Sequence, residues 1–133
     1  MSKDYRCPRC EAVLNPDRSV ILVAAHGPTR ALIGFHPEPG NYEVYLPPGV
    51  AAEQGSRWDF SCPLCHADLA AAENEDLCEL ELREDDATSR LLFSRIAGEQ
   101  ATFVLREDHV EQAHGSDAVR FDPIWAQLKY IRI

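Results

Sequence analysis

The chain has 133 residues, of which 45% are hydrophobic, and a formal net charge of −9. This length fits one domain, or one domain with a small appendage, and the hydrophobic fraction is that of a globular rather than a disordered chain. No stretch approaches the ~18–20 apolar residues that span a bilayer, and the start MSKDYRCPRC lacks the apolar run of a secretory signal. The sequence therefore predicts a cytoplasmic protein without a membrane segment.

The negative charge is concentrated in the second half of the chain. Residues 1–66 carry 6 basic and 7 acidic residues, for a net −1, whereas residues 67–133 carry 7 and 15, for a net −8. Phosphate binding needs clustered basic residues, so this distribution argues against nucleic acid as the main partner. The acidic half either keeps the protein soluble or forms a docking face for a basic partner.

Apolar and polar residues alternate over most of the chain, which predicts strands separated by short turns. The predicted strands, in chain order, cover 19–25, 30–36, 42–46, 56–61, 77–83, 89–96 and 100–105. The last three form a β-meander, and 109–117 has room for one more short strand. In the strand at 77–83, Cys78 falls on the apolar face, which predicts a buried core thiol rather than a reactive one.

Two segments are predicted to be helical rather than extended. The Ala-rich connection 68–76 has room for one or two helical turns. At the C-terminus, Asp122 is placed as an N-cap ahead of Pro123, which favours a short helix over a final strand. The segment 121–133 is too apolar to remain in water, so we expect it to pack on the protein's own sheet, or else to bind a partner or a second copy.

Four of the five cysteines form two CxxC pairs, Cys7-Pro8-Arg9-Cys10 and Cys62-Pro63-Leu64-Cys65. In a reducing compartment such pairs indicate metal ligands rather than disulfides. Two intervening residues allow a tight turn that points both sulfurs to one side, with backbone amides donating to them. Four thiolates make a closed tetrahedral site. The predicted metal ligands are therefore Cys7, Cys10, Cys62 and Cys65, and the predicted metal is zinc.

Iron remains the alternative metal, because four thiolates suit a single iron equally well. The Cys-Pro-x-Cys pattern also resembles rubredoxins, but those place Gly after the second Cys, where this chain has Glu11 and His66. Dithiol redox chemistry is a further alternative.

The spacing between the pairs predicts the architecture, since 51 residues separate Cys10 from Cys62. A simple zinc ribbon has roughly 15–20 residues there, so this gap holds several strands. The chain resembles small bacterial zinc-ribbon-like proteins of unassigned function. The similar segments are the two cysteine pairs, Leu46-Pro47-Pro48-Gly49, Trp58-Asp59-Phe60 and the run 91–99. By spacing alone the chain also resembles β-tent folds such as yippee-like and cereblon-like domains. These resemblances imply a zinc site, with two sheets clamped by it in the β-tent case.

No pattern of catalytic or cofactor-binding residues is present, since the chain lacks a Gly-rich phosphate loop, a Ser-His-Asp set and a nucleophile elbow. A second metal site at His109 and His114 has no acidic residue in register. His66, beside the second pair, is expected either to accept a hydrogen bond or to replace the usual turn Gly, since His tolerates left-handed geometry.

The prediction is a mostly β protein, with a zinc-clamped domain at 1–69 followed by an acidic β-meander and C-terminal segment at 70–133, packed as one unit. Its predicted function is that of a non-enzymatic zinc-binding protein that acts through protein contacts, as an adaptor, accessory subunit or regulator. Self-association through 121–133 is one form of such contact. The alternative is a rubredoxin-like iron-thiolate electron carrier or redox protein.

Overall fold

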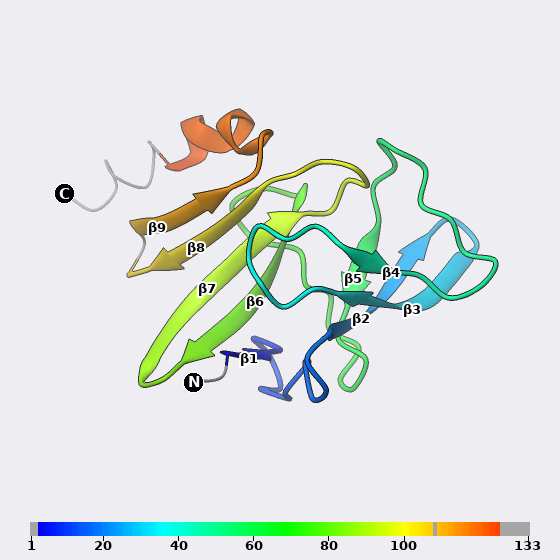
Figure 1. Cartoon of the computed structure of the whole chain (residues 1–133), viewed down its shortest axis with the longest axis horizontal. Coiled ribbons are helices and arrows are strands. Elements are labelled where there is room, and N and C mark those ends of the chain that lie inside the picture. Colours follow the sequence, from blue (N-terminus) through cyan, green and yellow to red (C-terminus); the bar gives the residue numbers. More distant parts are fainter. Residues whose placement is uncertain (1–2, 108, 126–133) are drawn as a thin grey trace.

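The computed structural model describes residues 3–107 and 109–125, and it is mostly β (Figure 1). Nine strands and one 3-10 helix are described. They are β1 (Lys3–Arg6), β2 (Val20–His26), β3 (Thr29–Phe35), β4 (Val44–Tyr45), β5 (Asp59–Ser61), β6 (Leu77–Glu84), β7 (Ala87–Ser94), β8 (Thr102–Arg106), β9 (His109–His114) and η1 (Ala118–Phe121). No helix in these ranges is long and apolar enough to cross a membrane.

The strands form two antiparallel sheets. The larger sheet has the order β1-β6-β7-β8-β9, and the smaller sheet has the order β4-β3-β2-β5. Strands β6 to β9 are consecutive neighbours, so the predicted meander is confirmed and extended by one strand. The predicted fold class, mostly β with two sheets, a group of four cysteines and a short C-terminal helix, is also confirmed.

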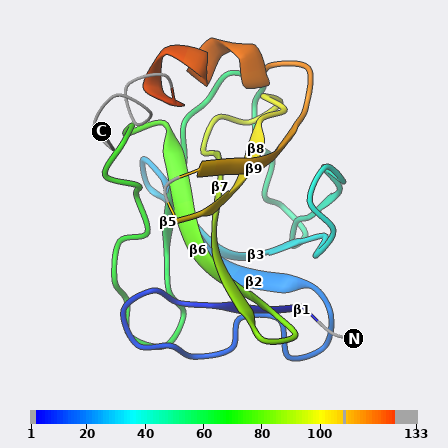
Figure 2. The same cartoon turned by 90° about the vertical axis from the view of Figure 1, so that its left-hand side faces the viewer.

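The larger sheet is covered on both faces, which explains why β8 is apolar without alternation. All four residues from Thr102 to Leu105 are buried. Val104 belongs to the core between the two sheets, whereas Phe103 and Leu105 belong to a second core beneath the C-terminal helical segment. Figures 1 and 2 show this arrangement. The smaller sheet lies on one side of the meander, and the orange helical segment lies away from the smaller sheet.

Three details differ from the sequence prediction. Strand β1 was not predicted, because Tyr5 is its only large apolar residue; pairing of Tyr5 with Leu82 of β6 makes it a strand. The helical turns predicted for 68–76 are wrong, since that segment consists of turns, bends and isolated bridges. The third predicted strand, 42–46, is reduced to the two residues of β4.

The C-terminal helix also begins earlier than predicted. Its first turn is η1, and Asp122 has helical angles (φ −52°, ψ −41°), so Asp122 is not the N-cap. Helical residues continue from 122 to 125. Phe121 and Trp125 pack on Phe103, with ring centroids 5.6 and 4.8 Å away. The described part of the segment therefore packs on the protein's own sheet, and residues 126–133 lie outside the described residues.

The predicted domain division at 69/70 stays a prediction. One observation bears on how the two segments meet: β1 lies in the first segment and pairs with β6 of the second. Strand β1 is thus the edge of a sheet whose other strands all come from the later part of the chain.

Candidate metal centre

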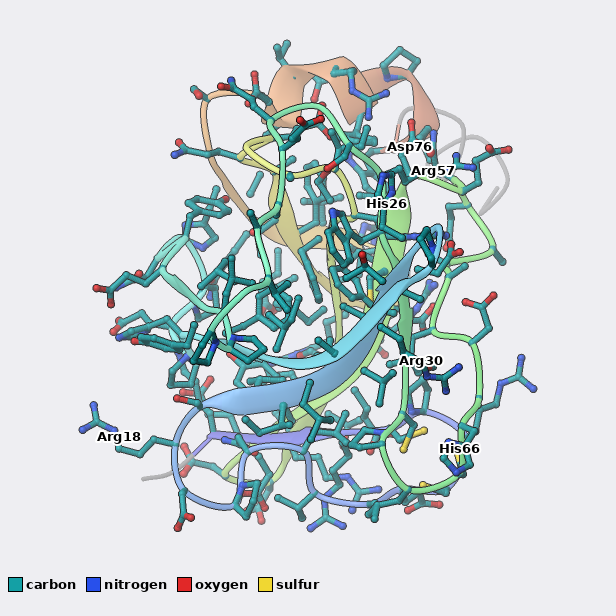
Figure 3. All side chains as sticks on the ribbon, turned by 90° about the vertical axis from the view of Figure 1, so that its right-hand side faces the viewer. Arg18, His26, Arg30, Arg57, His66 and Asp76 are labelled. Carbon is teal, nitrogen blue, oxygen red and sulfur yellow. The ribbon has the colours of Figure 1, made fainter. Side chains whose placement is uncertain are left out.

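Each CxxC pair directly follows a strand, and the two strands belong to different sheets. Cys7 follows the end of β1 in the larger sheet, and Cys62 follows the end of β5 in the smaller sheet. We call the segments 7–14 and 62–69 the first and second knuckle. Figure 3 shows sulfur atoms beside His66, at the opposite end of the molecule from His26 and Asp76.

The two knuckles have the same hydrogen-bond pattern. In the first, the amides of Cys7 and Glu11 donate to the carbonyls of Ala12 and Cys7 at 3.1 and 2.9 Å. In the second, the amides of Cys62 and His66 donate to the carbonyls of Ala67 and Cys62, both at 3.0 Å. The similarity seen in the sequence is therefore a structural repeat of about eight residues.

Each knuckle closes on the strand that precedes it. The amide of Leu14 donates to Tyr5 at 2.7 Å, and the amide of Leu69 donates to Phe60 at 3.0 Å. Both leucines are buried in the core between the sheets.

Each knuckle then carries the chain from one sheet to the other. The Leu14 carbonyl accepts from Ile21 of β2 at 2.8 Å, and the Leu69 carbonyl accepts from Glu79 of β6 at 2.7 Å. The first knuckle thus runs from the larger sheet to the smaller, and the second runs back. The four cysteines lie where these two crossings meet.

The four sulfurs are close enough to share one ion. All lie within 4.8 Å of one another. The Sγ atoms of Cys7 and Cys65 are 3.7 Å apart, and those of Cys10 and Cys62 are 3.8 Å apart. A tetrahedral zinc with bonds of about 2.3 Å to sulfur places its ligands about 3.8 Å apart. The donor set therefore fits a tetrahedral thiolate-binding metal.

Backbone amides point at the first sulfur of each knuckle, as the sequence predicts. Cys7 Sγ accepts from the amides of Arg9 and Cys10 at 3.3 and 3.5 Å. Cys62 Sγ accepts from the amides of Leu64 and Cys65 at 3.3 and 3.4 Å. Such donors disperse the negative charge of a thiolate without adding a charged side chain.

The residue after the second cysteine of each knuckle has a left-handed backbone. The φ angle is 63° at Glu11 and 65° at His66. This is the position where a Gly would be unstrained. The expectation that His66 replaces a turn Gly is confirmed, and Glu11 does the same in the first knuckle.

The site is buried on one side and open on the other. Cys7 and Cys62 are fully buried, whereas Cys10 and Cys65 are exposed. Burial raises the pKa of the Cys7 thiol to about 12, while the amide hydrogen bond from Ala67 and the neighbouring thiols lower the pKa of Cys65. A bound metal replaces the thiol protons, so binding is weaker at low pH.

The other residues singled out in the sequence lie away from this centre. Cys78 is fully buried in the core between the sheets, as predicted, and burial raises the pKa of its thiol. His109 and His114 are the two ends of β9. Within residues 3–107 and 109–125, no other group of three or more His, Cys, Asp or Glu side chains gathers at metal-binding distance.

One buried charge was missed by the sequence reasoning. Arg95 is only 6% exposed, and its guanidinium donates to the carbonyls of Trp58 and Glu75 at 3.0 and 2.8 Å and to the carboxylate of Asp59. It ties β5 of the smaller sheet to the end of β7. No sequence pattern marks it, because its partners lie 20 to 37 residues away.

Comparison of the chain with protein families, with curated proteins and with solved structures found no match. The resemblance to zinc-ribbon-like proteins and to β-tent folds therefore stays a prediction. What the fold itself defines is a two-sheet β protein with a four-cysteine group able to hold a metal.

Proposed function

We propose that this protein binds one zinc ion through Cys7, Cys10, Cys62 and Cys65, and that the ion is a structural clamp in a non-enzymatic protein that acts through protein contacts. The observation that carries the proposal is the convergence of the four sulfurs within 4.8 Å from two knuckles attached to different sheets.

The clamp role follows from where the ligands are attached. Each knuckle contributes two of the four cysteines, one buried and one exposed. Both knuckles are therefore needed to complete the site. A metal bound to all four closes a loop of more than fifty residues and fixes the two sheets to each other at that point. Four protein ligands leave no open coordination position for a substrate, which is typical of structural zinc sites.

The outer face of the smaller sheet supports the second half of the proposal. Leu32 of β3 is 57% exposed and Tyr45 of β4 is 47% exposed. Both lie on the face of the sheet opposite the buried Leu22 and Ile33. The half-buried Ile21 and Val23 of β2 lie on the same face as Leu32 and Tyr45. An apolar stripe on a sheet face is typical of a protein contact surface.

Metal content tests the first half of the proposal. Elemental analysis of the purified chain should give one zinc per molecule, and Cys62→Ser should lose it. Cys78→Ala is the matched control, because it removes a buried thiol outside the metal group, and it should keep the zinc. A chain that purifies without metal under reducing conditions and takes up none when zinc is added would contradict the proposal.

An iron electron carrier is the second candidate, and the exposure of Cys10 and Cys65 favours it, because electron transfer needs ligands near the surface. The same sample separates the two candidates. A ferric tetrathiolate absorbs strongly in the visible range and a zinc site does not. If the visible absorption scales with an iron content near one per chain, the bound metal is iron and the zinc proposal is wrong.

The contact surface is tested separately from the metal. Leu32→Ser and Tyr45→Ser should abolish capture of a partner, or self-association measured by sedimentation, while zinc content stays at one per chain. Leu64→Ser is the control, since Leu64 is 66% exposed but lies at the tip of the second knuckle. Equal effects of all three substitutions would argue against a defined surface.

A further inference from the structure

An apolar cavity of about 250 Å³ opens between the two sheets. Its walls come from all four strands of the smaller sheet and from β1, β6, β7 and β8 of the larger sheet. The segment 36–43, which follows β3, and the turn 95–101, which follows β7, complete the opening. None of the four metal-site cysteines lines it.

Three phenylalanines from both sheets line this cavity. The ring centroids of Phe35, Phe60 and Phe93 are 5.4, 5.6 and 5.9 Å apart. Phe60 is buried, but Phe35 and Phe93 keep part of their surface exposed. The space between packed sheets is normally filled by side chains, so an aromatic recess that stays open is available to a guest molecule.

The size of the cavity limits the guest. An apolar cavity of about 150 Å³ stays dry and takes up benzene. A cavity of about 250 Å³ therefore accommodates one aromatic ring with substituents, or two fused rings. A longer chain or a peptide would have to extend out through the opening.

The opening is held in place by hydrogen bonds to the larger sheet. The Tyr5 hydroxyl donates to the Pro37 carbonyl. The Tyr42 hydroxyl donates to the His114 carbonyl at 3.1 Å and hydrogen-bonds Thr102 Oγ1 at 3.0 Å. The wall is thus formed before a ligand arrives, which lowers the cost of binding. These polar groups are already paired, so they do not require a polar ligand.

Charged groups at the cavity are mostly acidic. Glu38, Glu43 and Glu99 line it, together with His36 and Arg95. Arg95 is turned to its own partners, the carbonyls of Trp58 and Glu75 and the carboxylate of Asp59. Glu99 pairs with Arg120 at 2.8 Å, which leaves Glu38 and Glu43 as exposed carboxylates. A ligand that carries a carboxylate would be repelled there.

We propose that this cavity is a binding site for a small aromatic molecule of one or two fused rings that carries no negative charge. The proposal goes beyond the metal clamp and does not depend on it. Loss of one leaves the other standing, because binding to the cavity and metal content are measured separately.

Indole and indole-3-carboxylate make a matched pair of probes. Titrated into the purified full chain and followed by amide NMR shifts, indole should saturate with a dissociation constant of about 1 mM or below. Indole-3-carboxylate should bind several-fold more weakly than indole. The double variant Glu38→Gln, Glu43→Gln should reduce the difference in affinity between the two probes. Absence of saturable indole binding would overturn the proposal, and equal affinity for both probes would overturn its charge requirement.

Two alanines provide the matched variants. Ala97 lines the cavity and packs against the core, whereas Ala72 is exposed and does not line it. Ala97→Phe should fill the space and reduce indole binding at least tenfold, and Ala72→Phe should leave it unchanged. Unchanged binding to a folded Ala97→Phe protein, or loss in both variants, would place the indole elsewhere and overturn the proposal.

A third variant decides the case if Ala97→Phe does not fold. Phe93→Leu keeps the side chain apolar but removes one of the three rings. It should weaken indole binding several-fold while zinc content stays the same. Wild-type affinity in Phe93→Leu would overturn the aromatic site.

Discussion

Glu11 and His66 occupy equivalent positions in the two knuckles, with φ angles of 63° and 65°. A left-handed backbone at a residue with a Cβ costs about 1–2 kcal/mol. Both residues accept this strain where the chain turns back beneath the sulfurs, which indicates that the surrounding hydrogen bonds and any bound ion impose the turn.

His66→Gly should therefore stabilise the protein by about 0.5–1 kcal/mol, after allowance for the greater freedom of Gly in the unfolded chain. His66→Val should destabilise it by more than about 1 kcal/mol, because a β-branched side chain is worse in this region. Denaturant unfolding of the two variants with metal bound measures both effects. A gain in stability for His66→Val would contradict the strain at this position.

Glu11→Gly is the parallel substitution in the first knuckle, and it should stabilise less. Glu11 also pairs with Arg83 at 3.0 Å, and this ion pair is lost with the side chain. The pair is exposed, so its contribution is small. An equal or larger gain than for His66→Gly would mean that the pair adds nothing.

Phe121→Ala tests whether the C-terminal helical segment is part of the core. Phe121 is fully buried and its ring meets Phe103 with centroids 5.6 Å apart. The substitution should cost about 3–5 kcal/mol of unfolding free energy. Val119→Ala, in the same turn but 70% exposed, should cost less than about 0.5 kcal/mol. Similar small losses in both variants would mean that this segment does not contribute to the core.

The pH dependence of stability should include Glu73. Arg90 donates to both of its carboxylate oxygens at 2.8 Å, which lowers the pKa of Glu73 below its ordinary value of 4.5. A carboxyl with a lowered pKa in the folded state adds stability above its unfolded pKa and loses it as the pH falls through the folded pKa. The pair is partly exposed, so we expect about 1 kcal/mol.

Glu73→Gln should accordingly be less stable than the wild type at pH 7, and the difference should shrink as the pH falls below 4.5. Unfolding curves at several pH values measure this. A difference that stays constant down to pH 2 would show that the effect of Glu73 is not electrostatic.

The sequence predicted the features that depend on local pattern. Alternation in 77–83 predicted β6 and the burial of Cys78, and the CxxC repeats predicted which four sulfurs come together. These are properties of spacing alone, so one sequence is enough to find them.

What the sequence did not predict depends on contacts between distant residues. Strand β1 has one large apolar residue and becomes a strand through its pairing with β6. The helix starts at Ala118 without a side-chain cap, because burial of Phe121 rather than a capping signal fixes its position. The cavity beside Phe93 likewise exists only once the two sheets and the segment 36–43 are assembled.

The central claim is that a metal at the four cysteines joins the two sheets. Hydrogen exchange of the zinc-loaded chain with and without a chelator tests it most directly. On chelation, the amides of Cys7, Leu14, Cys62 and Leu69, which close the two knuckles, should exchange much faster, while the β6–β7–β8 amides stay protected. Unchanged protection at these four amides, or loss at only one knuckle, would contradict a metal clamp between the sheets.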